Sequence, residues 1–516
     1  MNEEARPSRI AGALALARAR PFAAFALGLL VILTIMAALP FAPEGPHDPR
    51  TWRRSDAGTI EFPAAGALVE PVASLGHVIA GSPDIRVAAV STLLWVLAVG
   101  GLVSLIVAIR RGRAPLWAAL GTLGGAGAWL GVFLAWVGFS ALVRLPSWRF
   151  VKGSEDTVIA DLQSHTFGSH DGLVSPRESL AWHAARGYDV VAVTEHNDPG
   201  GAYEAQALAE MSALPAGVIP GIEWCEPEGG GYLLAIGLDG DKPPPTMARP
   251  AASAERFIQE TRARHGGATL ALAWRLKPDD VVRLAEAGLD GFEISNSGHP
   301  DIPHDVREAL LRETEARGIL LVSSTDWHGW GGFARTWTAL RVPGTADMSP
   351  PEKARAVLMI IRERRVEDVT PVTAGYMGPP STMRALFSPF AESGRYAMEL
   401  GPLRVAAWWI WAAALVGIAE LLRRARMRPG RTILAAFLTV LGGGLVYQGT
   451  RLLGAWAAGA RAGVFLVRVG GWGLGIGFAT LAAATVLAVL EVRRRRTSQP
   501  GSDAPREPAS AKGDAT

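Results

Sequence analysis

The 516-residue chain contains a single cysteine, Cys225. One thiol cannot close an intrachain disulfide or supply a cluster of zinc thiolates, so both features are excluded. Charged residues are also scarce, at 19% of the chain, and the formal net charge is only +3. A charge so close to neutral gives little support for nucleic-acid binding, and we expect no nucleic-acid partner.

Long apolar segments dominate the rest of the composition. Hydrophobic residues make up 49% of the chain, and the mean hydropathy is +0.20. These values are typical of a membrane protein, and the length exceeds that of one compact domain. Six segments approach the roughly 20 apolar residues that a spanning helix needs. They lie near 22–41, 87–109, 116–143, 404–422, 432–447 and 472–492.

Arginine clusters border these segments, and their positions predict the topology. They are Arg6, Arg9, Arg18 and Arg20; Arg110, Arg111 and Arg113; Arg423, Arg424, Arg426, Arg428 and Arg431; and Arg493 to Arg496. With six spans all four clusters fall on one side of the membrane, which the positive-inside rule makes cytoplasmic. We therefore predict an integral inner (plasma) membrane protein of a bacterial cell envelope. Both termini would be cytoplasmic, and the region between the third and fourth spans extracytoplasmic.

This topology divides the chain into six regions. They are a cytoplasmic N-terminus (1–21), three transmembrane helices with an extracytoplasmic loop at 43–86 (22–149), a folded domain (150–378), a juxtamembrane linker (379–402), three more transmembrane helices (403–496) and a disordered cytoplasmic tail (497–516). The first span also resembles a cleaved signal peptide, although its apolar core is long for one. Residues 451–469 carry three arginines among apolar residues, so we expect an interfacial helix there rather than a seventh span.

The central region alternates short apolar strands with helical segments. Strands are expected at 157–162, 190–194, 218–220, 232–236, 269–273, 291–294 and 319–323, and further helices at 253–265, 278–287 and 303–317. Ser175-Pro176-Arg177-Glu178 combines an N-cap, a proline at the first helical position and a glutamate three residues after the cap. Strand–helix alternation predicts parallel strands, and about seven units suggest a barrel.

Four polar clusters lie at the ends of these strands. They are Asp161–Thr166, Thr194–Asn197, Gly221–Glu223 and Thr325–His328. In β/α barrels the reactive groups lie at the C-terminal ends of the strands. Imidazole and carboxylate groups brought together there indicate a divalent metal site.

The order of these clusters resembles the PHP family, named for polymerase and histidinol phosphatase domains. The family's Asp-Leu-His-x-His-Thr reads here Asp161-Leu-Gln-Ser-His-Thr166, followed by Ser169-His-Asp-Gly172 and Ser175-Pro176. The motifs Thr-Asp/Glu-His-Asn, Gly-x-Glu and Ser-x-Asp-x-His-Gly match 194–197, 221–223 and 324–329. The resemblance covers roughly residues 155–375. It implies an α/β fold, a distorted seven-stranded β/α barrel, here inserted between two groups of three transmembrane helices.

The resemblance also implies two sets of metal ligands. One position would use Gln163, His165, Glu223 and Asp326, with Gln163 in place of a family histidine; the other would use Asp171, His196 and His328. A third family position depends on residues that are Tyr232 and Trp274 here, so it looks lost. We expect one or two divalent ions (Mn²⁺, Zn²⁺ or Fe²⁺), with Glu223 as the bridging ligand.

Three further residues are candidates for catalysis. His170 is either an acid or base beside the site or a solvated loop histidine. Glu195 would orient His196 or lie behind the ligands. Arg335 is a candidate contact for phosphate oxygens, with an ordinary surface charge as the alternative.

These features predict a membrane-anchored, metal-dependent hydrolase that cleaves a phosphate ester. Its substrate would be a phosphorylated small molecule or a lipid-linked or cell-envelope compound. The alternative is a catalytically degenerate domain that acts as a metal- or ligand-binding sensor or scaffold. A transport role is disfavoured because the predicted spans contain almost no carboxylate or lysine in their cores.

Overall fold

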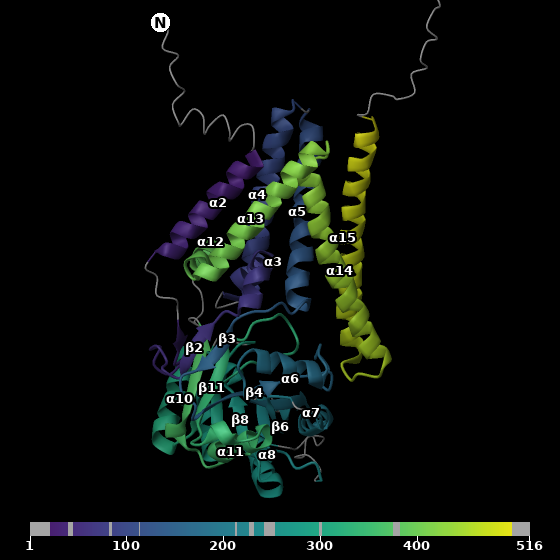
Figure 1. Ribbon diagram of the computed structural model, residues 1–516. Helices are drawn as coiled ribbons and strands as arrows, with labels where there is room; N and C mark the ends of the chain where they lie inside the picture. Colours follow the sequence, from purple (N-terminus) through teal and green to yellow (C-terminus); the bar gives the residue numbers. More distant parts are fainter. Residues whose placement is uncertain are drawn as a thin grey trace, which may run out of the picture.

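The computed structural model describes residues 21–39, 45–81, 85–112, 114–211, 214–225, 232–241, 253–298, 302–374 and 382–497. Apart from their border residues, the predicted cytoplasmic N-terminus (1–21) and the predicted disordered tail (497–516) lie outside these ranges. A layer of helices stands above an α/β domain, and polypeptide from both halves of the chain builds the helical layer (Figure 1).

The helical layer has the composition expected of a membrane protein. Five helices of the described chain are long and apolar enough to cross a bilayer: α4 (Ile85–Arg110), α5 (Pro115–Leu142), α13 (Pro402–Arg424), α14 (Pro429–Ala457) and α15 (Gly463–Thr497). The first predicted span corresponds to α2 (Pro21–Ala38), whose apolar stretch Ala26–Ala38 is shorter. The count of six spans and their orientation therefore stay predictions.

Three segments outside the predicted spans and the α/β domain differ in structure from the prediction. The predicted loop at 43–86 contains the strands β1 (Pro46–His47) and β2 (Gly58–Glu61) and the apolar helix α3 (Ala64–Gly81). The predicted linker contains α12 (Thr382–Met398). The interfacial helix expected at 451–469 is wrong, because Arg451 belongs to α14 and Arg468 to α15, with a short turn around Gly459 (φ +87°) between them.

A curled sheet of ten strands forms the centre of the α/β domain, rather than the seven strands expected. Its order is β1-β12-β11-β4-β5-β6-β7-β8-β9-β10. All seven expected strands are present as β4 (Thr157–Ser164), β5 (Val190–His196), β6 (Gly217–Cys225), β7 (Tyr232–Ile236), β8 (Ala268–Leu272), β9 (Gly291–Asn296) and β10 (Leu320–Ser324). The additional members are β1, β11 (Thr336–Arg341) and β12 (Val369–Ala374). They are antiparallel to their neighbours, so they fall outside the strand–helix alternation on which the prediction rested.

The strands are parallel only in part. Pairs β4–β5, β5–β6, β8–β9 and β9–β10 are parallel, whereas β7 runs antiparallel to both neighbours, and β11 and β12 are antiparallel as well. Strands β2 and β3 (Arg149–Lys152) form a separate pair between the domain and the helical layer (Figure 1). The C-terminal ends of β4, β5, β6 and β10 therefore meet at one edge of the sheet.

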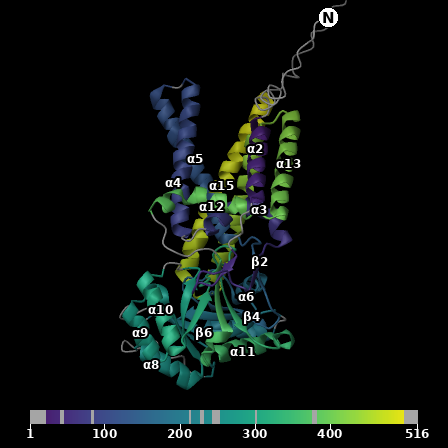
Figure 2. The same ribbon diagram turned by 90° about the vertical axis from the view of Figure 1, so that its left-hand side faces the viewer.

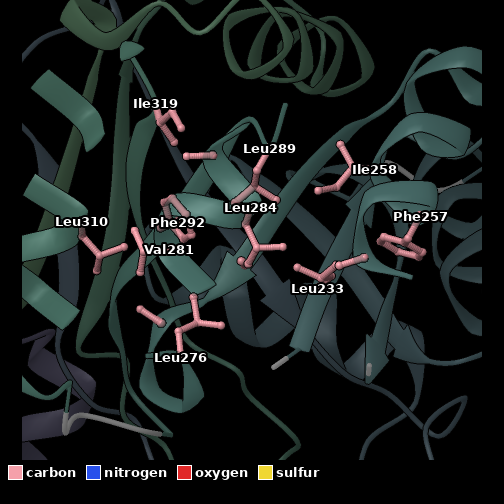
Figure 3. Packing of buried hydrophobic residues seen from close by; sticks show 14 of the residues in the cluster. Leu233, Phe257, Ile258, Leu276, Val281, Leu284, Leu289, Phe292, Leu310 and Ile319 are labelled. Carbon is pink, nitrogen blue, oxygen red and sulfur yellow. The ribbon is translucent and has the colours of Figure 1, made fainter. Parts of the chain in front are cut away.

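Helices α6 (Pro176–Ala185), α7 (Gly200–Met211), α8 (Ala254–Glu260), α9 (Pro278–Glu286), α10 (His304–Arg317) and α11 (Pro350–Arg362) cover the sheet (Figure 2). The predicted capping box at α6 is confirmed, since the Glu178 backbone N–H donates to Ser175 Oγ and the Glu178 carboxylate accepts from the Ser175 N–H. Leu233 and Phe292 pack against Phe257, Leu284 and other apolar residues of α8 to α10 (Figure 3). This packing fixes the strands relative to one another. It therefore also fixes the positions of the polar residues at the strand ends.

A buried carboxylate joins three helices of the upper layer. Glu70 of α3 accepts hydrogen bonds from Arg404 Nη2 of α13 (2.7 Å) and the Tyr396 hydroxyl of α12 (2.7 Å), and it pairs with His77 Nδ1 (2.8 Å). Glu70 is completely buried. Sequence analysis missed this network because it assigned Glu70 to a loop.

Glu70→Ala should lower stability by about 3–5 kcal/mol, since it leaves the Arg404 guanidinium buried without its charge partner. Thermal unfolding of the purified full-length protein in detergent would report the effect as a lower Tm. Glu61→Ala is the matched control, because Glu61 pairs with Arg149 at the surface and such pairs contribute less than about 1 kcal/mol. Equal Tm values for the two variants would contradict a stabilising role for the network.

Candidate metal centre

His165, Glu223 and Asp326 form the first part of the centre. They come from the ends of β4 and β6 and from the loop after β10. His165 Nε2 lies 3.2 Å from Glu223 Oε2 and 3.2 Å from Asp326 Oδ1. The side chains of all three are nearly inaccessible to solvent. The structure thus brings together the three strongest ligands expected at the first metal position.

Asp171, His196 and His328 form the second part. The two oxygens of Asp171 lie 3.4 Å from His196 Nε2 and 3.4 Å from His328 Nε2. Glu223 connects the two parts, because its Oε1 lies 3.7 Å from His196 Nδ1 while its Oε2 faces His165. A carboxylate with one oxygen toward each group has the geometry expected of a bridging ligand.

Hydrogen bonds set the direction in which two of the imidazoles offer a lone pair. Nδ1 of His165 lies 2.9 Å from Ser169 Oγ, and Nδ1 of His328 donates to the Asp326 carbonyl at 2.8 Å. In its neutral form, each ring would then offer the Nε2 lone pair to a cation, as metal-ligating histidines do. Among the described residues these two Nε2 atoms and Asp171 Oδ1 are buried without a hydrogen-bond partner.

The charge state of the cluster fits a divalent cation. Burial opposes ionisation of Asp171, but the neighbouring imidazoles of His196 and His328 hold the pKa of Asp171 well below its ordinary value. Burial and the nearby His165 lower the pKa of His328, which favours the neutral, ligating form. His165 is also buried, yet Asp326 and Glu223 outweigh that effect and raise the pKa of His165. Nitrogen and oxygen donors without thiolates suit Mn²⁺, Zn²⁺ or Fe²⁺.

Glu195 supports the ligands from behind the cluster. It is completely buried, and its Oε2 accepts hydrogen bonds from Ser169 Oγ (2.5 Å) and the Thr166 N–H (3.1 Å). The same Ser169 hydroxyl receives the backbone N–H of His196 at 3.0 Å. Glu195 therefore acts through Ser169 on His165 and His196, rather than on a reacting atom.

Gln163 lies at the cluster, with its amide nitrogen toward Glu223. Its Nε2 donates to Glu223 Oε2 at 2.6 Å, and its Oε1 accepts from Asn296 Nδ2 at 3.0 Å. Asn296 also donates to Glu293, and the burial of Glu293 raises the pKa of that carboxyl well above its ordinary value. A chain of side chains thus fixes Gln163 in an orientation that holds Glu223.

A second buried carboxylate, Asp161, positions the loop that carries Asp326. Asp161 accepts a hydrogen bond from the Thr325 N–H at 2.9 Å and pairs with His183 Nε2 at 2.9 Å. Asp326 itself has a positive φ of 54°. Left-handed backbone at a residue other than glycine is strained and concentrates at functional sites, where the surrounding structure holds it.

Two of the three predicted catalytic residues lie at the edge of the cluster or away from it. The His170 side chain is 74% exposed at the rim, and its ring centroid lies 4.7 Å from that of His196. Arg335 does not join the ligands. It lines a cavity of about 400 Å³ between the domain and helices α12 and α13, where its Nη2 donates to the Ala374 carbonyl at 3.4 Å. The contact of Arg335 with substrate phosphate stays a prediction, and the structure places this side chain toward the helical layer.

The residues that replace the family's third set of ligands pack against one another. The rings of Tyr232 and Trp274 stack at 5.8 Å, and the Arg275 guanidinium lies 4.8 Å and 4.6 Å from their centroids. Such cation–π contacts use the faces of the rings rather than lone pairs. The number of metal ions that the centre holds stays a prediction.

Sequence reasoning missed Ser169, Glu293, Asn296 and Arg275. Ser169 stands inside the quoted motif and could have been found there. Glu293 and Asn296 end an apolar strand as the other clusters do, in Glu-Ile-Ser-Asn, so their position was available as a signal. Arg275 could not have been placed, because its contact with Tyr232 joins segments that are distant in sequence.

Among known proteins, solved structures of metal-dependent phosphoesterases and of an amidohydrolase are similar to this chain. No family model matches the chain, and no curated protein matches it. A two-domain protein from Bacteroides vulgatus that contains a predicted PHP-like metal-dependent phosphoesterase is 18% identical over 46% of this chain and 70% of its own (TM-score 0.33). A candidate metal-dependent phosphoesterase from Bifidobacterium adolescentis is 18% identical over 39% and 96% (TM-score 0.29). An amidohydrolase from Chromobacterium violaceum, with bound sulfate and no metal, is 15% identical over 41% and 96% (TM-score 0.29).

Ser169→Ala should weaken metal binding about 10- to 100-fold, because His165 and Glu195 then lose the hydroxyl between them. Isothermal titration of the metal-free full-length protein with Mn²⁺ or Zn²⁺ measures this directly. Ser154→Ala, at an exposed turn of the same domain, should leave the affinity unchanged. An unchanged affinity in Ser169→Ala would remove Ser169 from the support of the centre.

Proposed function

We propose that this protein is a membrane-anchored, PHP-like metal-dependent hydrolase that cleaves a phosphate ester at a centre of one or two divalent ions. One observation carries the proposal: the buried acceptor atoms His165 Nε2, His328 Nε2 and Asp171 Oδ1 have no hydrogen-bond partner and converge with Glu223 and Asp326. Clustered carboxylates repel one another unless a cation lies between them. The motif order from residue 161 to 329 supports the same conclusion.

The residues divide the work of hydrolysis among themselves. A divalent ion at this centre supplies Lewis acidity toward phosphate oxygens and toward water. Glu223 holds the two groups of ligands at a fixed separation, since each oxygen faces one of them. His170, exposed at the rim, is placed to give a proton to the leaving alcohol. Arg275, also exposed, offers a guanidinium for phosphate oxygens.

A second candidate function is a metal- or ligand-binding sensor or scaffold without catalysis. The observation in its favour is Gln163, whose amide donates to Glu223 where the family places a metal-ligating histidine. An oxygen of Glu223 that accepts this bond is a weaker ligand. The third group of family ligands is also replaced by the Tyr232–Trp274 stack. Both functions require metal binding, and only the first requires hydrolysis.

The full-length protein, purified in detergent and loaded with Mn²⁺ or Zn²⁺, should hydrolyse generic phosphate mono- or diesters. His196→Ala and Asp326→Ala should each lower kcat/KM by more than about 100-fold, because losing a ligand exceeds the effect of losing an outer partner. His304→Ala, at an exposed position on α10, is the control and should keep full activity. Bound metal without hydrolysis in the parent protein would favour the sensor; activity that survives both substitutions would exclude the proposed centre.

A further inference from the structure

The hairpin of α14 and α15 is hydrogen-bonded to the loop that carries Asp171. The Ala462 N–H donates to the Phe167 carbonyl at 3.2 Å, just before the metal residues of this loop. Arg451 Nη2 donates to the Leu173 carbonyl at 2.8 Å, just after them. The hairpin therefore holds the loop at both ends.

Charge and packing strengthen this attachment. Arg451 Nη1 also donates to both oxygens of Glu178 at 2.9 Å and 2.8 Å, and Arg144 binds the same carboxylate. Leu173 packs in one apolar cluster with Leu452 and Leu466 of the hairpin. Figure 1 shows the lower end of the hairpin beside α6 and α7. The metal loop and the hairpin are thus one packed unit.

The hairpin reaches the two other loops of the centre as well. Arg461 forms an ion pair with Asp198, two residues after His196. Phe465 of α15 packs edge-on against Trp330, two residues after His328, with ring centroids 6.2 Å apart. All three metal-bearing loops therefore contact the same apolar hairpin.

Helix length places this contact at the edge of the bilayer. From Arg431 to Arg451, α14 rises about 30 Å at 1.5 Å per residue, which equals the thickness of the hydrocarbon core. Arg451 then marks the hydrocarbon boundary, and residues 452–457 project only about 9 Å beyond it. The Asp171 loop bound by Arg451 consequently lies at the level of the lipid headgroups.

Apolar side chains are exposed where the hairpin contacts the loop after His328. Val464 of α15 and Trp330 are 67% and 42% exposed, and Phe465 of α15 packs against Trp330. Exposed aromatic residues at this depth favour the membrane interface. A soluble phosphate ester would gain no binding free energy from these apolar side chains. An acyl chain would gain it, because the chain would bury apolar surface against them.

We propose that the phosphate ester is carried by a membrane lipid and reaches the metal centre from the adjacent leaflet at the α14–α15 hairpin. The acyl chain lies against Trp330 and Phe465 while the headgroup phosphate enters the centre. Water adds to phosphorus, the P–O bond to the alcohol breaks, and the alcohol takes up a proton. This inference rests on the proposed phosphoesterase function and specifies its substrate class.

The test compares lipid esters with soluble esters of the same headgroup. Full-length protein in nanodiscs with Mn²⁺ is assayed on dioleoyl phosphatidic acid against glycerol 3-phosphate, and on dioleoyl phosphatidylglycerol against glycerophosphoglycerol. In at least one pair, kcat/KM for the lipid should exceed that for the soluble ester by about 100-fold or more. Trp330→Ala should lower this ratio about tenfold through KM, and Trp117→Ala, at the far end of α5, should leave it unchanged.

The outcomes separate the two proposals. Equal hydrolysis of the lipid and soluble members, or hydrolysis of soluble esters alone, overturns the lipid substrate and leaves the phosphoesterase function intact. A preference for lipid that Trp330→Ala does not reduce overturns the entry route. Hydrolysis of no ester by a metal-loaded protein counts against the phosphoesterase function itself.

Discussion

Repulsion among three carboxylates in one small, largely buried volume is the constraint on which the rest of the structure depends. Asp171, Glu223 and Asp326 approach the same set of imidazoles, and such a group is stable only with a compensating cation or fixed donors. The fold supplies the donors from behind: Ser169 holds two histidines, and Asp161 holds the loop of Asp326. The strained backbone at Asp326 shows that this positioning takes precedence over local conformational preference.

The candidate centre departs from the PHP pattern that it resembles at Gln163, Tyr232 and Trp274, where the pattern has metal-ligating residues. Replacing a histidine by Gln163 gives Glu223 a hydrogen-bond donor in place of a ligand. Replacing the third set of ligands by Tyr232 and Trp274 removes lone pairs and adds the Arg275 guanidinium.

The helical layer and the domain are integrated rather than simply tethered. Strand β1, from the segment before the domain, pairs with β12, and the α14–α15 hairpin binds the metal loops. The Glu70–Arg404 network fixes α3 to the start of α13, beside the cavity that contains Arg335. A fragment of residues 150–378 would lack β1 and the α14–α15 hairpin, which contact the domain. Experiments on the candidate centre therefore need the intact chain.

The sequence by itself determined the candidate ligands, the apolar helices and the seven central strands, because motifs, hydropathy and capping signals are local. His165, His196, Glu223 and His328 could be named from four short clusters. Only the tertiary structure decided the antiparallel placement of β7, the separation of Arg335 from the centre, and the contact of Arg451 with the Asp171 loop. These depend on pairings between distant segments, whose energies come from packing and charge in three dimensions and leave no periodic pattern in the chain.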